Sequence, residues 1–500
     1  MDQLFLLGPL KLKEMLVRDL QRMNPWWEGQ PQRPLPATRR HLVGNIQRRL
    51  QKGLAPIVVV RGPRQVGKTI AQLQVLQDLL DHGAIPRTIM RVQCDELSAF
   101  EDLDEPILRI VDWYEENVLG KTLNEAAHAG EKVFLFFDEV QNLPKWAPQL
   151  KFLVDSAAVQ VVVTGSSALR IELGRDSLAG RITSIEAGVL SLTEIANFHA
   201  VDLDRPFLDD NGLERLTRKD FWLDLAAAGR KRRDQRDFAF RKFSERGGYP
   251  LAHQTSDLPW AQVADQLNET VIRRVIQHDL RVGDVGRKRD AALLEEVFRL
   301  ACRYVGQSPG PTLFAREAHR SLQANVGEQR IRHYLRFLGD TLLLRLIEPL
   351  EIRLKKKRGY AKICLADHGL RASWLQEIVP LDPVALAQEP HLSVLSGHIA
   401  ESVAGSLLFT IPGLDLAYLP GRGDQPEVDF VLTIGTKRIP LEVKYQTRVD
   451  PLADTEGLRA FIEKTANNAP FGLLVTQTEV DNVDDPRLVC LPLSSLMLLR

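Results

Sequence analysis

The sequence lacks the features that mark secreted, disulfide-bonded or membrane proteins. Its 500 residues include four cysteines, at positions 94, 302, 364 and 490, and their spacing is unlike that of metal ligands. We expect buried thiols in a reducing compartment. Signal-peptide features, internal repeats and runs of ~18 apolar residues are also lacking. These absences predict a cytoplasmic protein that does not contact a membrane.

A net charge is lacking as well. The 65 Lys and Arg residues are balanced by 65 Asp and Glu residues. The composition therefore gives no sign of nucleic-acid binding, and any such affinity must come from local basic patches. With 44% hydrophobic and 26% charged residues the chain is typical of globular proteins. At ~100–200 residues per domain, its length predicts three or four domains.

Short β-branched runs alternate with helical stretches from residue 55 onward. We predict strands at 57–60, 88–94, 133–137 and 161–164, with a helix from 69 to about 80 after the first strand. This alternation is typical of a parallel α/β sheet. Residues 190–290 are predicted to be largely helical.

A phosphate-binding loop follows the first predicted strand and opens a helix. Its form is G-x-x-x-x-G-K-[ST], made of Gly62, Pro63, Arg64, Gln65, Val66, Gly67, Lys68 and Thr69. The loop N–H groups and the helix N-terminus would hold phosphates. Lys68 would reach the β- and γ-phosphates, and Thr69 would bind Mg²⁺. The loop predicts ATP and Mg²⁺ as ligands.

Two acidic residues end the buried strand at 133–137. We predict that Asp138 binds Mg²⁺ through a water molecule and that Glu139 activates the water that attacks the γ-phosphate. The pair favours hydrolysis over phosphoryl transfer to a small molecule.

Three further residues are candidates around the same site. The strand at 161–164 is expected beside the strand that leads into the phosphate loop, so Ser166 or Thr164 could sense the γ-phosphate. Arg181, with Arg175 as the alternative, could stabilise charge on the ATP of a neighbouring subunit. A shared site of this kind predicts a homo-oligomer, for which a ring is one form. The alternative for Arg181 and Arg175 is that each is an arginine on the solvated surface with no role at the ATP site.

Residues 293–365 have the pattern of a winged helix, with three helices followed by a hairpin. The third helix, 328–338, has an apolar face with Ile331, Tyr334, Leu335 and Leu338. Its other face carries Arg330, Arg332 and Arg336, and the hairpin tip carries Lys355, Lys356, Lys357 and Arg358. These basic residues are candidates for contact with nucleic acid, most readily DNA. A winged helix used only for packing is the alternative.

A second group of candidate catalytic and metal-binding residues lies near the C-terminus. Glu442 and Lys444 are two apart on a predicted strand and share a face, and a turn at 435–436 brings Asp429 back toward Glu442. Two carboxylates could hold Mg²⁺, and Lys444 could stabilise charge on a phosphodiester. Glu401, on the preceding helix, is a further candidate ligand. The alternatives are a solvated hairpin and a nuclease-like fold that does not cleave.

Several of these segments resemble prokaryotic AAA-family ATPases that are fused to a C-terminal domain of uncharacterised function. The resemblance covers roughly residues 40–480 and rests on segments 62–69, 137–141, 164–167, 178–181, 247–250, 367–370, 427–430 and 442–445. Segments 427–429 and 442–444 also resemble the core of PD-(D/E)XK nucleases. The resemblance implies ATP hydrolysis, a winged helix and a nuclease-like fold. One departure is Ser or Thr at the sensor position, where related motors carry Asn.

We therefore predict a multidomain α/β protein. The expected parts are a helical lead-in (1–50), a RecA/AAA-like parallel-sheet ATPase (51–200), a helical lid (201–290), a winged helix (291–370) and a small α/β PD-(D/E)XK-like domain (371–500). Three functions fit this organisation. We predict the first, an ATP-hydrolysing, DNA-acting protein that couples the ATPase to a Mg²⁺-dependent nuclease-like domain in DNA repair, recombination or defence. The alternatives are a DNA-remodelling ATPase with a non-cleaving nuclease fold and a nucleotide-switch signalling or scaffold ATPase that acts on protein partners.

Overall fold

The structure, a computed structural model, describes residues 12–94, 103–165, 178–208, 212–276, 290–323, 325–351, 359–421 and 426–500. The chain divides into two compact units, residues 1–187 and 188–500. The boundary lies before residue 200, where we expected the ATPase to end. Each unit is described separately below.

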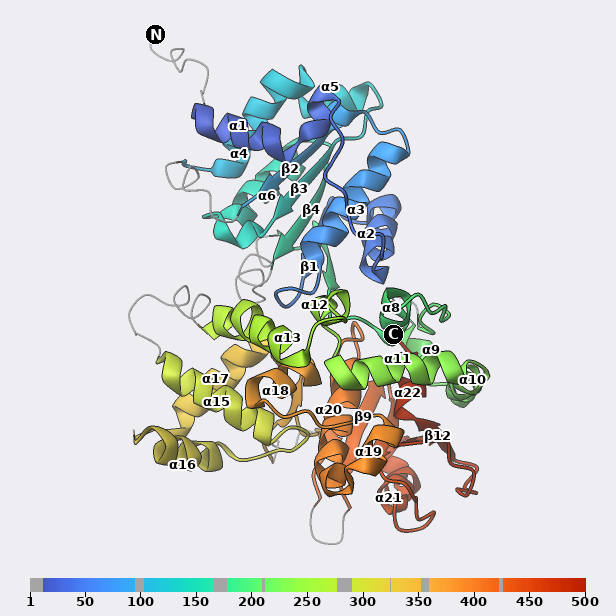
Figure 1. The fold of residues 1–500 in the computed structure, drawn as a ribbon. Coiled ribbons are helices and arrows are strands. Elements are labelled where there is room, and N and C mark those ends of the chain that lie inside the picture. Colours follow the sequence, from blue (N-terminus) through green and yellow to red (C-terminus); the bar gives the residue numbers. More distant parts are fainter. Residues whose placement is uncertain are drawn as a thin grey trace. The chain divides into compact units, whose positions relative to one another are not determined.

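A five-stranded parallel sheet forms the centre of the N-terminal unit, in the order β2-β3-β4-β1-β5 (Figure 1). Its strands are β1 (Ile57–Arg61), β2 (Ile89–Gln93), β3 (Phe134–Asp138), β4 (Gln160–Gly165) and β5 (Ile182–Glu186). The four predicted strands are present, and β4 pairs with β1 as expected. The fifth, β5, was not predicted. Strand β1 is buried at every residue except Arg61, which is typical of a parallel sheet that is covered on both faces.

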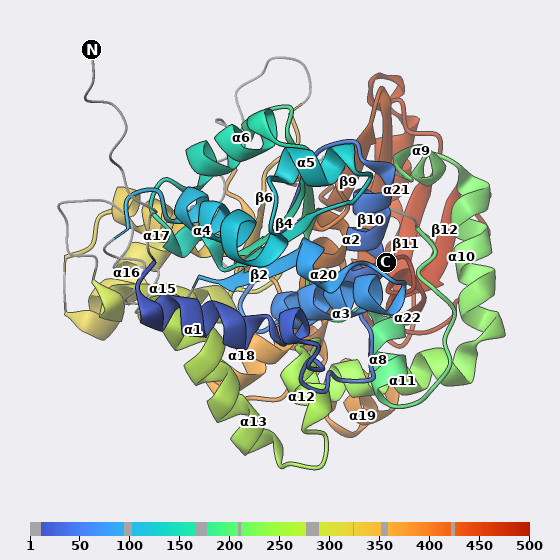
Figure 2. The same ribbon diagram turned by 90° about the horizontal axis from the view of Figure 1, so that it is seen from above.

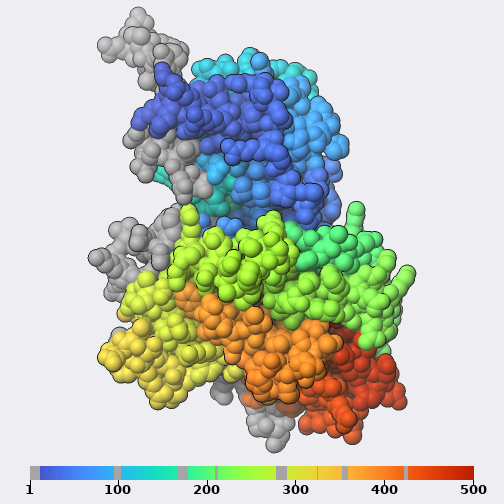
Figure 3. All heavy atoms as spheres, viewed as in Figure 1, coloured from blue at the N-terminus to red at the C-terminus, as the bar shows by residue number. Residues whose placement is uncertain are grey.

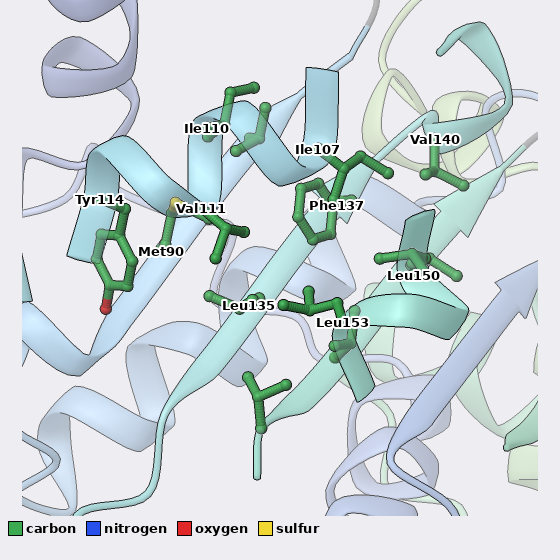
Figure 4. Packing of buried hydrophobic residues seen from close by; sticks show 14 of the residues in the cluster. Met90, Ile107, Ile110, Val111, Tyr114, Leu135, Phe137, Val140, Leu150 and Leu153 are labelled. Atoms are coloured by element: carbon green, nitrogen blue, oxygen red, sulfur yellow. The ribbon is translucent and has the colours of Figure 1, made fainter. Parts of the chain in front are cut away.

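Helices cover both faces of this sheet. They are α1 (Glu14–Met23), η1 (Pro25–Glu28), α2 (His41–Lys52), α3 (Lys68–Asp81), η2 (Pro86–Thr88), α4 (Pro106–Tyr114), η4 (Glu115–Leu119), α5 (Leu123–His128), η5 (Val140–Asn142) and α6 (Trp146–Ser156). Helices α2 and α3 lie on one face. Figure 4 shows the core on the other face, where Leu135 and Phe137 of β3 pack against apolar residues of α4 and α6.

Two adjacent tryptophans join the N-terminal segment to this sheet. The indole N–H groups of Trp26 and Trp27 both donate to the carbonyl oxygen of Ile89, at 3.0 and 2.8 Å. Both side chains therefore pack within the N-terminal unit and satisfy their polar atoms on the first residue of β2.

The C-terminal unit begins with helices. They are α8 (Leu192–Phe198), α9 (Leu213–Leu216), α10 (Lys219–Lys231), α11 (Arg233–Arg246), α12 (Pro250–Gln254), α13 (Trp260–Leu267) and η7 (Asn268–Arg273). A capping box starts α8, where the Ser191 hydroxyl accepts from the Glu194 N–H and the Glu194 carboxylate accepts from the Ser191 N–H. The predicted helical character of this region is observed in its described residues.

Three helices and an antiparallel strand pair come next. They are α15 (Ala291–Arg303), α16 (Pro311–Leu322), α17 (Glu328–Asp340), β6 (Leu344–Ile347) and β7 (Lys362–Leu365). The buried face of α17 is formed by Ile331, Tyr334, Phe337 and Leu338. Phe337 is buried where we expected Leu335, which is only partly buried. The basic hairpin tip, 355–358, lies outside the described residues.

The C-terminal sheet has the order β12-β11-β10-β9-β8. Its strands are β8 (Asp415–Leu419), β9 (Val428–Ile434), β10 (Lys437–Lys444), β11 (Gly472–Thr476) and β12 (Leu488–Pro492). Strands β8, β9 and β10 are antiparallel neighbours, whereas β11 and β12 run parallel to β10. Helix α10 packs against β12, as Figure 2 shows.

Helices complete this part of the chain. They are α18 (His368–Leu375), α19 (Pro383–Gln388), η9 (Pro390–Leu392), α20 (Ser393–Phe409), α21 (Glu456–Glu463), η10 (Thr465–Asn467) and α22 (Leu493–Leu496). In Figure 3 the segment around α18–α20 lies between helices α15–α17 and the C-terminal sheet.

Residues 390–409 form the one described helix that is long and apolar enough to cross a membrane by length and composition. The segment includes Glu401, His391 and His398, so it is not a continuous apolar run. Within this unit α20 packs against β6, β7 and β10, and it buries Ile399, Ala400, Ala404 and Leu408. Its apolar character is thus explained by its place in the core.

Candidate functional site

The predicted phosphate loop lies between β1 and α3. Gly67 has φ 88°, a conformation that glycine adopts without strain, and a Cβ on Gly62 would lie 2.3 Å from a carbonyl oxygen. The Lys68 ammonium donates to the carbonyl oxygens of Gly62 and Pro63, at 2.9 and 2.8 Å. The loop backbone therefore folds around the lysine that we expect to contact phosphate.

Asp138, at the end of β3, is buried and surrounded by three donors. Its Oδ1 accepts from the Thr69 hydroxyl at 3.2 Å and from the Thr164 hydroxyl. Its Oδ2 accepts from the Arg91 guanidinium at 3.1 Å. The structure thus brings Thr69, Asp138 and Thr164 together. Arg91 was not predicted, although an arginine inside the apolar strand β2 was a visible signal.

Glu139 follows Asp138 and is half-buried. Its φ of 53° is in the left-handed region, which is uncommon for a residue other than glycine and costs energy. Its N–H donates to the Thr164 hydroxyl at 3.2 Å, and its Oε2 accepts from the Gln141 amide at 2.5 Å. Two side chains therefore orient the residue that we expect to activate water.

Thr164 connects both acidic residues, since its hydroxyl donates to Asp138 and accepts from the Glu139 N–H. Of the two sensor candidates it is the one that the structure describes. Ser166 and the alternative Arg175 lie outside the described residues. The contacts of Thr164 support a role in positioning Asp138 and Glu139.

We predict that Thr164→Val lowers the kcat of ATP hydrolysis by roughly 10- to 100-fold, because hydrogen bonds to charged groups contribute about 1.5–3 kcal/mol. Valine has nearly the same shape but neither donates nor accepts. Thr164→Ser keeps the hydroxyl and should stay close to wild type. A phosphate-release assay measures both variants, and equal activity of Thr164→Val and wild type would contradict this role.

Arg181, the expected trans-acting arginine, is held within its own chain. Its guanidinium pairs with both carboxylate oxygens of Asp155, with 2.9 Å between Nη2 and Oδ2, and contacts the carbonyl oxygen of Ala179 at 3.1 Å. The hydrogen bond that its guanidinium donates to Asp155 raises the pKa of Arg181. Its action on a neighbouring subunit stays a prediction.

Mg²⁺ fits the N-terminal site. The oxygens of Thr69 and Asp138 converge within 3.2 Å, and a few protein oxygens completed by phosphates and water are the usual Mg²⁺ environment. When bound with ATP, Mg²⁺ would neutralise phosphate charge. Lys68 would bind the phosphates, and Glu139 would accept the proton of the attacking water.

The C-terminal acidic residues come together on β9, β10 and α20. We name Glu401, Asp429 and Glu442 the C-terminal carboxylate cluster. The Asp429 Oδ2 accepts from the Val443 N–H at 2.9 Å, and the Glu442 Oε2 accepts from the Asp429 N–H at 3.4 Å. The turn that we predicted between the strands therefore joins Asp429 to Glu442, as expected.

Two lysines pair with this cluster, and one of them was not predicted. The Lys444 ammonium lies 2.8 Å from the Glu442 Oε1. The Lys362 ammonium, from β7, contacts the Asp429 Oδ1 at 3.1 Å and also contacts Glu401. Lys362 is distant in sequence and has no motif around it, so only the folded chain reveals its place.

Mg²⁺ does not fit the C-terminal carboxylate cluster as it stands. Among the described residues, no group of three or more His, Cys, Asp or Glu is arranged to hold a metal ion. The metal set of Glu401, Asp429 and Glu442 therefore stays a prediction, and the contacts of these carboxylates argue against it. These carboxylates are close to one another, but their oxygens already accept from lysine ammonium and backbone N–H groups.

The pKa values in this cluster follow from burial and mutual charge. Burial, reinforced by Asp429, raises the pKa of Glu442 to about 8. Burial and Asp429 also raise the pKa of Glu401 well above its usual value. Burial opposes the charge of Asp429, but Lys362 and the Val443 N–H outweigh it and lower that pKa. Burial likewise opposes the charge of Lys362, and Asp429 and Glu401 raise its pKa nevertheless.

The third helix of the three-helix segment presents its predicted arginines to solvent. Arg330, Arg332 and Arg336 are all exposed on α17. The Arg330 guanidinium lies over the Tyr334 ring at 5.7 Å, and Arg332 lies 3.8 Å from the Glu328 carboxylate. Of the predicted basic contacts, Lys355, Lys356, Lys357 and Arg358 lie outside the described residues.

Two of the sequence segments noted above meet inside the C-terminal unit. The buried Asp367 carboxylate accepts from the Gly248 N–H at 2.6 Å and from the Gly369 N–H at 2.8 Å. Gly247, with φ 73°, leaves no room for a side chain, because a Cβ there would lie 2.2 Å from the Asp367 Oδ1. Segments 247–250 and 367–370 are therefore parts of one structural contact.

Two family models match different parts of the chain. Residues 55–196 match the family described as an AAA domain. This stretch is an AAA-type P-loop ATPase domain. Residues 237–379 match a second family, described as a domain of unknown function (DUF8612). The AAA domain accounts for the predicted nucleotide site, whereas the second match assigns no activity.

Curated relatives share most of the chain at low identity. Two mycobacterial proteins, named uncharacterized proteins of Mycobacterium bovis and Mycobacterium tuberculosis, are each 25% identical over 382 residues, which is 74% of this chain and 66% of theirs. An uncharacterized protein of Haemophilus influenzae is 22% identical over 321 residues, or 63% of this chain and 68% of its own. The chain thus spans just under two thirds of its mycobacterial relatives.

A solved structure, that of C. elegans PCH-2, is also similar. It is 14% identical, covers 32% of this chain and 42% of its own, and has a TM-score of 0.22. A likeness of this size carries no argument about function.

Proposed function

We propose that this protein is an AAA-type ATPase that acts on DNA. In this proposal its C-terminal nuclease-like domain binds DNA but does not cleave it. In the N-terminal unit, Lys68, Thr69 and Asp138 would hold Mg-ATP and Glu139 would activate water. The AAA match and the contacts around Asp138 support ATP hydrolysis.

The exposed arginines of α17 are the observation that carries the DNA part of the proposal. Arg332 and Arg336 lie on the face of α17 away from the buried residues, and Arg330 is exposed beside Tyr334 near the start of the helix. Three helices followed by an antiparallel strand pair support a winged helix, in which the third helix faces DNA. Arginines placed in this way would bind phosphates or base edges.

The order of elements from α20 to β11 supports a nuclease-like fold at the C-terminus. A helix is followed by three antiparallel strands, a helix and a parallel strand, with Asp429, Glu442 and Lys444 on the central pair. This arrangement resembles the PD-(D/E)XK core. Because lysines pair with the carboxylates, we propose the non-cleaving form rather than Mg²⁺-dependent cleavage.

ATP turnover with and without DNA tests the proposal. Labelled duplex, single-stranded and branched DNA would be incubated with Mg²⁺ and ATP, using wild type, Lys68→Ala and Glu442→Ala. We expect DNA to stimulate wild-type turnover, no turnover in Lys68→Ala and no cleavage in any lane. Cleavage that Glu442→Ala abolishes would instead identify a nuclease. Turnover without a DNA effect would indicate a nucleotide switch for protein partners.

We predict that replacing Arg330, Arg332 and Arg336 together with Ala weakens DNA binding at low salt. If each arginine neutralises one phosphate, the slope of log K against log salt decreases by roughly 2.7. Fluorescence anisotropy across a salt series measures this slope. The matched control replaces Arg299 and Arg303, which are exposed on α15, with Ala. Equal slopes for the two variants would contradict the assignment of α17.

Oligomerisation through a shared ATP site is also proposed, with Arg181 acting on the neighbouring subunit. The contact with Asp155 would have to open for this role. Sedimentation with and without ATP tests assembly. Loss of turnover in Arg181→Ala, restored in mixtures with Lys68→Ala subunits, tests the action in trans.

A further inference from the structure

Lys362 is buried at the centre of acidic side chains. Its side chain is 2% exposed, and its ammonium lies 3.1 Å from the Asp429 Oδ1, 3.4 Å from the Glu427 Oε1 and in contact with Glu401. Moving a lysine charge out of water is costly unless opposite charges replace the water. The surrounding carboxylates supply that replacement, so the ammonium and the acidic groups stabilise one another.

Aromatic rings complete the surroundings of this ammonium. The Lys362 Nζ lies 5.2 Å from the centre of the Tyr418 ring and 5.3 Å from that of the Phe430 ring. Cation–π contacts within about 6 Å are favourable and are stronger when water is excluded. Lys362 is therefore bound on several sides by groups that prefer a cation.

The oxygens that a metal would need are already occupied. Lys362 takes the Asp429 Oδ1 and the Val443 N–H takes Oδ2, while Lys444 takes the Glu442 Oε1. Mg²⁺ demands six oxygens near 2.0–2.1 Å in octahedral order. A divalent ion between Asp429 and Glu401 would also be repelled by the Lys362 ammonium, which contacts both.

We propose that Lys362 is a built-in cation that takes the place of a divalent metal in the C-terminal carboxylate cluster. The two ammonium groups of Lys362 and Lys444 balance two of the three buried carboxylates without any metal. Because Lys362 belongs to β7 and Glu401 to α20, the same contacts hold the strand pair β6–β7 to the core of the C-terminal domain. This inference depends neither on ATP hydrolysis nor on DNA binding.

Mn²⁺ binding to the nucleotide-free full-length protein tests the proposal. The electron paramagnetic resonance signal of free Mn²⁺ reports how much metal the protein takes up. We expect that the wild-type protein takes up no Mn²⁺ whose binding requires Glu442. Lys362→Met replaces the ammonium by an apolar group of similar length and should bind one Mn²⁺ per chain. Its affinity should exceed that of wild type at least about tenfold, since a like charge beside the ion has been removed.

Two controls test whether the gain in Mn²⁺ binding arises at the C-terminal carboxylate cluster. The double variant Lys362→Met with Glu442→Gln should lose the bound Mn²⁺ again. Lys437→Met removes an exposed lysine from the same strand as Glu442 and should bind no more Mn²⁺ than wild type. Thermal unfolding gives a second measurement, because Lys362→Met should melt several degrees lower and Mn²⁺ should restore part of the loss.

Two results would overturn the inference. One is wild-type Mn²⁺ binding without nucleotide that Glu442→Gln abolishes, and this result needs no variant at position 362. The other is a folded Lys362→Met protein that binds no Mn²⁺. The inference rests on the non-cleaving form of the C-terminal domain, which the DNA cleavage assay tests separately. Neither result bears on whether DNA stimulates ATP turnover, so failure here and failure of the proposed ATPase function are distinguishable.

Discussion

ATP turnover falls roughly 10²- to 10⁴-fold when Glu139 is replaced by Gln, while ATP binding is retained. A positioned general base typically contributes a factor of this size. The amide keeps the shape of the side chain but cannot accept the proton of water. Lys68 and Thr69 are unchanged in this variant, so the phosphates should still bind. Phosphate release measures turnover, and titration with a fluorescent ATP analogue measures binding.

Glu131→Gln is the matched control for this prediction. Glu131 is a partly buried glutamate of the same domain, and it pairs with Lys121 at 2.8 Å. It is not in the ATP site, so its turnover should equal that of wild type. If Glu139→Gln kept more than about a tenth of wild-type turnover, another residue would have to activate the water.

The second large effect concerns stability. Gly247→Ala should lower the free energy of unfolding of the C-terminal unit by about 3 kcal/mol or more. Gly247 has φ 73° and ψ −159°, a region that is essentially restricted to glycine. The added Cβ would also lie 2.2 Å from the Asp367 Oδ1, which must then move away from the Gly369 N–H.

Gly397→Ala is the matched control, because it adds the same methyl group in the same unit. Gly397 lies inside α20, and nothing lies within 4 Å of the position of its Cβ. Alanine in a helix interior is favoured over glycine by roughly 0.5–1 kcal/mol, so this variant should be slightly more stable than wild type. Urea unfolding followed by circular dichroism compares the two. Equal stability of Gly247→Ala and wild type would contradict the role given to this contact.

The sequence by itself determined the local chemistry of the ATP site. The phosphate loop at 62–69 and the acidic pair Asp138–Glu139 are short segments whose residue order follows from what phosphate and Mg²⁺ require. Four strands of the N-terminal sheet were likewise predictable, because a strand buried on both faces is a continuous apolar run. The strand β5, Ile182–Glu186, was missed because it is only partly buried and mixes polar with apolar residues.

The pairing of Asp429 with Glu442 was also predictable, since the residues between them form a local hairpin. The short separation in sequence leaves few ways for the two carboxylates to meet. The same reasoning suggested Mg²⁺ between them, and the lysines that pair with these carboxylates argue against that suggestion. That reasoning used only the residues of nearby segments. A cation from a distant segment, such as Lys362, cannot be recognised in this way.

Only the tertiary structure decided which cations and donors complete each site. Arg91 reaches Asp138 from the neighbouring strand β2, and Lys362 reaches Asp429 from a strand 67 residues earlier in the chain. Asp367 meets Gly248 across 119 residues of sequence. A buried charge must be balanced by whichever groups the folded chain places beside it. That balance depends on packing between distant segments, and no local pattern of residues records it.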